Sequence, residues 1–132
     1  MAREFDVIFD STRETEKDFF QIASGYISKT TVLFEKEKVV AVIDAKGVVE
    51  FYDLDDNLLA TACVPKVTGG KEKYMDAAVK AAGDKLFVIF PLYEWIDNYP
   101  NCDGESDRWD ARIIGKTAVI FNKETNTATA EN

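Results

Sequence analysis

The stretch that decides the fold runs from residue 30 to residue 64 and reads TTVLFEKEKVVAVIDAKGVVEFYDLDDNLLATACV. It contains short runs rich in β-branched and aromatic residues, a composition typical of β-strands. The gaps between these runs carry turn-forming residues and are too short for a parallel crossover, so neighbouring strands must pair as antiparallel hairpins. The stretch therefore predicts a four-strand antiparallel meander. We expect its strands over residues 31–35, 39–44, 48–53 and 58–64.

The segments on either side of this meander predict helices. Ser11 and Glu14 have the spacing of a capping box, and apolar residues follow at helical intervals up to residue 28. Residues 71–82 place their apolar side chains on one helical face, and Gly83 is a plausible helix C-cap. The predicted fold is thus a single α+β domain over residues 1–132, a mainly antiparallel sheet packed by about two helices. The remaining strands are expected over residues 4–10, 86–90, 113–121 and 127–130, and the expected core includes Val42, Ile43, Val49, Phe51, Leu86, Val88 and Phe121.

The chain is acidic, with 24 Asp and Glu residues against 16 Lys and Arg residues and a net charge of −8. This field repels phosphate backbones and anionic lipids, so we expect no direct binding to nucleic acid or to a membrane. The longest apolar runs, residues 39–43 and 86–92, are far too short to span a bilayer. Residues 4–6 carry acids where a secretory signal needs apolar side chains, which predicts a cytoplasmic location.

The absence of His excludes Ser-His-Asp, Cys-His and His-metal chemistry. Paired carboxylates, a catalytic Lys and an oxygen-ligated metal stay open, but none has a distinctive spacing in this sequence, so we expect no enzyme, no cofactor and no metal site. Residues 67–71 lack the full phosphate-loop pattern, and residues 103–114 lack the glycine and glutamate of an EF-hand. Cys63 and Cys102 show no metal-binding spacing and are interpreted as free thiols. The apolar neighbours of Cys63 predict that it is a small buried residue.

The most informative segment is residues 94–110, which holds six acids, one base and both Trp residues of the chain. Its two Pro/Gly breakers and lack of a clear period predict a long loop, preceded by a strand that Pro91 interrupts. Aromatic side chains interleaved with charges of one sign are typical of binding hot spots for a basic partner. The alternative is that the two Trp side chains fold inward as loop anchors. The predicted partner-binding residues are Trp95, Asp97, Tyr99, Asp103, Glu105, Asp107 and Trp109.

These features predict a small acidic cytoplasmic binding protein that inhibits or neutralises a basic protein, such as a toxin or a nucleic-acid-binding protein. Immunity-like inhibition and mimicry of nucleic acid both fit this charge. The alternative is a small-ligand-binding protein or an enzyme without His, with a pocket between sheet and helices. Such a pocket would use Glu50 or Glu94 together with Lys71 or Lys85. A structural subunit of a larger assembly is a third possibility.

Overall fold

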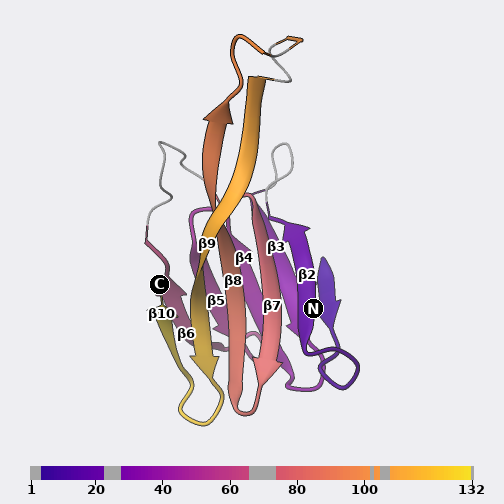
Figure 1. The fold of residues 1–132 in the computed structure, drawn as a ribbon. Coiled ribbons are helices and arrows are strands. Elements are labelled where there is room, and N and C mark those ends of the chain that lie inside the picture. The colour runs from indigo at the N-terminus through magenta and orange to yellow at the C-terminus, as the bar shows by residue number, and fades with distance from the viewer. Residues whose placement is uncertain (1–3, 23–27, 66–73, 102, 105–107, 132) are drawn as a thin grey trace.

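A computed structural model describes residues 4–22, 28–65, 74–101, 103–104 and 108–131, with the backbone alone described for Trp95 and Trp109. These residues form two five-stranded sheets that pack face to face (Figure 1). The first sheet has the order β1-β3-β4-β5-β6 and the second has the order β10-β9-β8-β7-β2. The strands are β1 (Val7–Phe9), β2 (Glu16–Gln21), β3 (Lys29–Phe34), β4 (Val39–Asp44), β5 (Val48–Tyr52), β6 (Leu58–Cys63), β7 (Asp76–Ala82), β8 (Lys85–Asp97), β9 (Trp109–Asn122) and β10 (Thr127–Glu131).

The first sheet contains the meander predicted over residues 30–64. Strands β3, β4, β5 and β6 pair in sequence, each antiparallel to the next. Strand β1 joins the edge of this sheet parallel to β3, with Val7 opposite Val32. Within β1 the side chains alternate as a strand requires, because Phe9 is buried whereas Ile8 is exposed.

The prediction of an α+β fold with two helices is wrong, because neither segment is helical where the structure describes it and each contains a strand. Part of residues 11–28 is β2, and the Ser11 hydroxyl donates to a carboxylate oxygen of Glu37 at 2.5 Å instead of capping a helix. Most of the described part of residues 71–82 is β7, in which Ala77, Ala78 and Val79 are all buried. Pairing of β7 with β2 and β8 outweighs the high helix propensity of its alanines.

The core lies between the two sheets. The rings of Phe51 in β5 and Phe121 in β9 stack across this interface, with centroids 4.7 Å apart. Of the predicted core residues only Val42 is half-buried, and the other six are buried.

Cys63 is exposed at the end of edge strand β6, so the prediction that it is buried is wrong. None of the described residues belongs to a helix long and apolar enough to cross a membrane.

Candidate functional site: the β8–β9 arm

Strands β8 and β9 extend past the sandwich as a two-stranded ribbon (Figure 1). Strand β8 pairs with β7 only up to Ile89, whereas its pairing with β9 continues to Asp97 opposite Trp109. We call residues 93–113 the arm. The predicted long loop over residues 94–110 is therefore wrong at its two ends, because residues 94–97 and 109–110 are paired strand. The predicted interruption at Pro91 is also wrong, because β8 is unpaired on its β7 side there and proline is tolerated at such an edge.

A β-bulge marks the base of the arm. Leu92 pairs with Gly115 and Tyr93 pairs with Ile113, which leaves Ile114 as the extra residue. Ile113 is 47% exposed and Ile114 is 57% exposed. The Tyr93 hydroxyl donates to a carboxylate oxygen of Asp76 in β7 at 2.6 Å, and burial together with this bond raises the pKa of Tyr93 to about 12. The base is thus tied to β7 and presents two exposed isoleucines.

Charged side chains join the two strands of the arm. Glu94 and Arg112, which lie opposite each other, form an ion pair. Nearer the tip, the Arg108 guanidinium donates to both carboxylate oxygens of Asp97, from Nε at 2.9 Å and from Nη2 at 3.0 Å. This bidentate geometry is the strongest form of an arginine–carboxylate contact. An isolated two-stranded hairpin is only marginally stable, so these contacts supply order that the ribbon needs.

At the tip of the arm, the turn of residues 98–101 is built on the same ion pair. The backbone N–H of Tyr99 donates to Asp97 Oδ1 at 3.0 Å, and the N–H of Asn98 donates to the Arg108 carbonyl at 2.7 Å. These contacts hold the pKa of Asp97 below its usual range, first through the Arg108 side chain and then through the Tyr99 N–H. The peptide bond between Tyr99 and Pro100 is cis. The Arg108 guanidinium lies 5.2 Å from the centre of the Tyr99 ring, and Tyr99 remains 69% exposed.

The predicted partner-binding residues occupy different positions in this arm. Asp97 is engaged by Arg108 and shapes the tip, whereas Tyr99 and Asp103 are exposed. Trp95 and Trp109 lie on the paired strands, but their side chains are not among the described parts of the structure. Glu105 and Asp107 lie outside the described residues. The assignment of these seven residues to a partner-binding surface therefore stays a prediction.

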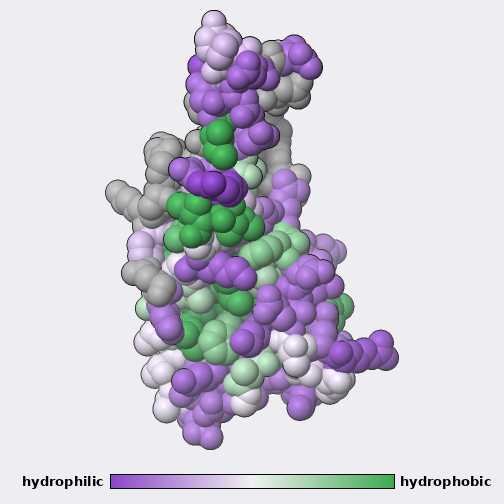
Figure 2. Space-filling model, in the orientation of Figure 1, coloured by the Kyte–Doolittle hydropathy of each residue, from purple (hydrophilic) through white to green (hydrophobic). Residues whose placement is uncertain are grey.

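Four residues of the arm and its base were missed by the sequence reasoning: Arg108 and Arg112 as partners of acids, and Ile113 and Ile114 as exposed apolar surface. A signal for this strand exists in the sequence, because residues 109–113 alternate apolar and charged side chains. With Arg112 included, residues 93–113 hold six acids and two arginines, a net charge of −4. Figure 2 shows the far end of the arm as mainly hydrophilic surface, with hydrophobic surface below it on the front sheet.

Among the residues that the structure describes, the alternative site is not assembled. The described residues contain no helix that could cover a sheet, so the pocket predicted between sheet and helices is not formed. Glu50 lies on β5 of the first sheet, while Lys85 and Glu94 lie far apart along β8 of the second. Lys71 is outside the described residues. Among the residues that are described, no three His, Cys, Asp or Glu side chains come together in a way that could hold a metal ion.

When the chain is compared with protein-family models, curated proteins and solved structures, nothing matches. What the arm does must therefore be argued from its geometry, its charge and its exposed side chains.

Proposed function

We propose that this is a small acidic binding protein of the cytoplasm that docks onto a basic protein partner through the end of the β8–β9 arm. The observation that supports it best is the tip itself. Tyr99 is 69% exposed, yet the turn that carries it is fixed by hydrogen bonds from Arg108 to Asp97 and from Tyr99 to Asp97. A contact residue that is already ordered before binding loses less conformational entropy when the complex forms.

Charge and side-chain type favour a basic protein over other partners. The arm carries a net charge of −4, half of the −8 of the whole chain, which would steer a cationic surface toward it. Tyrosine is enriched among residues that dominate binding energy, because it buries a large ring and keeps a polar hydroxyl. Covering a cationic active site or nucleic-acid groove would neutralise the partner. The proposal includes both a protein inhibitor and a mimic of nucleic acid.

The residues of the arm then have distinct roles. Tyr99 is the central contact and Asp103 is a steering charge at the exposed end. Asp97 and Arg108 are positioning residues, because each is occupied by the other and together they hold the turn. Trp95, Glu105, Asp107 and Trp109 stay predicted contacts.

A site-specific photo-cross-linking experiment tests this proposal. The full chain would carry a photoreactive phenylalanine analogue in place of Tyr99, or in place of Thr125 as a matched control. Thr125 is also exposed and lies in the β9–β10 turn, at the opposite end of the sandwich from the arm (Figure 1). In extracts of the source cells, we expect the Tyr99 position to cross-link one basic protein and the Thr125 position not to do so.

A second measurement with the captured protein tests the roles of the residues. Asp103→Asn is expected to lower the association rate and to flatten its dependence on salt, because an exposed charge acts through a field that salt screens. Tyr99→Ala is expected to speed dissociation instead. Equal cross-linking from both positions would contradict the proposal. So would a captured partner that has an acidic surface and whose association rate does not depend on salt.

A further inference from the structure

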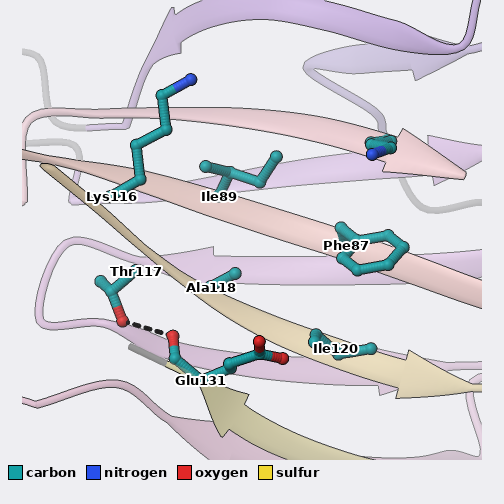
Figure 3. Close-up of a pocket in the computed structure, with 8 residues that line it drawn as sticks. Phe87, Ile89, Lys116, Thr117, Ala118, Ile120 and Glu131 are labelled. Atoms are coloured by element: carbon teal, nitrogen blue, oxygen red, sulfur yellow. Dashed lines mark hydrogen bonds between the residues drawn. The ribbon is translucent and has the colours of Figure 1, made fainter.

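The outer face of the second sheet has a hollow that is separate from the arm. Its volume is about 270 Å³, and it lies on β7, β8, β9 and β10 (Figure 3). This face is turned away from the core, because Phe87 and Ile89 alternate along β8 with the buried side chains of residues 86, 88 and 90. The lining residues are Lys80, Phe87, Ile89, Lys116, Thr117, Ala118, Ile120 and Glu131.

The floor of the hollow is apolar. Phe87 pairs with Ile120 and Ile89 pairs with Ala118, so these four side chains form two adjacent rows across β8 and β9. All four are half-buried although they face away from the core. The exposed face of an antiparallel sheet is usually polar, so a continuous apolar area here indicates a surface that can cover an apolar group.

Two lysines lie over aromatic rings beside this floor. Lys80 Nζ is 5.3 Å from the centre of the Phe87 ring, and Lys116 Nζ is 5.6 Å from the centre of the Phe19 ring. Lys116 starts on β9 and reaches Phe19 on β2, so both ammonium groups lie toward the β2–β7 side. Glu16 faces Lys80 across the β2–β7 pair, but within the described part of the chain neither lysine has an ion-pair partner.

The opposite side of the hollow is anionic. Glu131 comes from β10, and its main-chain oxygen accepts a hydrogen bond from the Thr117 hydroxyl at 2.8 Å (Figure 3). The hollow therefore has cations on its β2–β7 side, apolar side chains in the middle and a carboxylate on its β10 side. A ligand with one charged end could bind this arrangement in one orientation only.

We propose that the hollow binds a small amphipathic carboxylate, a molecule with an anionic head and one short apolar chain or ring. Its head would lie on the β2–β7 side of the hollow, near the ammonium groups of Lys80 and Lys116, and its apolar body would cover Ala118 and Ile120. Glu131 repels the head and so sets the orientation. The volume of about 270 Å³ is just below the usual range for drug-sized ligands, which restricts the ligand to a short chain or a single ring. This site is independent of the partner proposed for the arm.

Titration of the full chain with octanoate, followed by amide NMR shifts, tests this site. Octanoate supplies the carboxylate and an eight-carbon chain, and octylammonium is the matched probe with the same chain and the opposite charge. We expect octanoate to shift the amides of Phe87, Ile89, Ala118 and Ile120 in a saturable way, and octylammonium to shift them much less. Equal shifts from both probes, or no saturable shift from octanoate, would overturn the proposal.

Lysine variants separate specific binding from general charge effects. The double variant Lys80→Gln with Lys116→Gln should weaken octanoate binding by roughly threefold or more, the loss expected for two exposed ion pairs. Lys46→Gln removes one exposed lysine from the β4–β5 turn of the other sheet and should leave the affinity unchanged. If Lys46→Gln weakens binding as much as the double variant does, the hollow is not the site. Circular dichroism of each variant would verify the fold, and Ile89→Thr would test the apolar floor with a residue that strands accept.

Discussion

Replacing Gly47 with alanine should destabilise the protein by a predictable amount. Gly47 lies in the β4–β5 turn with a φ of +89°, in the left-handed region that L residues rarely adopt. A Cβ atom there would lie 2.5 Å from Val64 Cγ2 and 3.0 Å from Tyr74 Cε2. The backbone conformation alone costs about 1–2 kcal/mol for a residue with a Cβ. Overpacking against buried neighbours adds about 1–3 kcal/mol, for a total of about 2–5 kcal/mol.

The two neighbours cannot move away easily. Val64 and Tyr74 are both buried, and the Val64 N–H donates to the Gly47 carbonyl at 3.0 Å. The Tyr74 hydroxyl donates to the Pro65 carbonyl at 2.6 Å, and the Tyr74 N–H donates to the Ala45 carbonyl at 2.6 Å. A shift of either side chain would therefore break packing or a hydrogen bond.

Gly83 provides a matched control for this prediction. It lies in the β7–β8 turn with a φ of +61°, and nothing lies within 4 Å of the position its Cβ would take. Gly83→Ala should therefore show only the conformational cost, about 1–2 kcal/mol. The assay is urea unfolding followed by circular dichroism, with the variants compared at equal m-values. If Gly47→Ala is no more destabilising than Gly83→Ala, or if adding Val64→Ala to Gly47→Ala recovers none of the loss, the reasoning about the clash is refuted.

Three further predictions follow from the core, the arm and the edge strand. Phe121→Ala removes the ring that stacks on Phe51 and should cost about 3–5 kcal/mol in urea unfolding, whereas a loss below about 1 kcal/mol would contradict that packing. Because Arg108 holds the pKa of Asp97 low, their contact stabilises the tip at neutral pH and is lost as the pH falls through the folded-state pKa of Asp97. In an NMR titration Arg108→Gln should raise the pKa of Asp97, and an unchanged pKa would argue against the ion pair. Cys63 is exposed and should react with a thiol reagent in the folded protein as fast as in urea, so strong protection would place it elsewhere.

The meander could be predicted from sequence because its determinants are local. Gaps of a few residues between 31 and 64 allow only hairpins, whatever the rest of the chain does. Strands β2 and β7 could not be predicted in the same way. The alanines of residues 77–82 fit a helical face, and the partners that make this segment a strand come from β2 and β8. The partner in β2 is about sixty positions away in sequence, beyond the reach of any local pattern.

The composition of the sequence indicated where the arm lies, but it did not predict that the arm is a two-stranded ribbon. Charge and aromatic content singled out residues 94–110, and the alternation over residues 109–113 was a strand signal that Pro91 and the following breakers obscured. The pairing of Asp97 with Arg108 depends on the register of β8 and β9. That register changes at the Ile114 bulge, and a one-residue shift would put each side chain on the other face. From the sequence alone Asp97 is predicted to be a free acid, whereas in the structure it accepts hydrogen bonds from Arg108 and from the Tyr99 N–H and so holds the turn.

Hydrogen exchange of the complex with the partner captured at Tyr99 tests the central claim most directly. Each backbone amide of the chain would be compared with and without that basic partner. The account predicts that new protection is confined to the arm, residues 93–101 and 108–113, and that it weakens as salt is raised. Protection concentrated on the first sheet or on the β6 and β10 edges, with the arm amides unchanged, would contradict it.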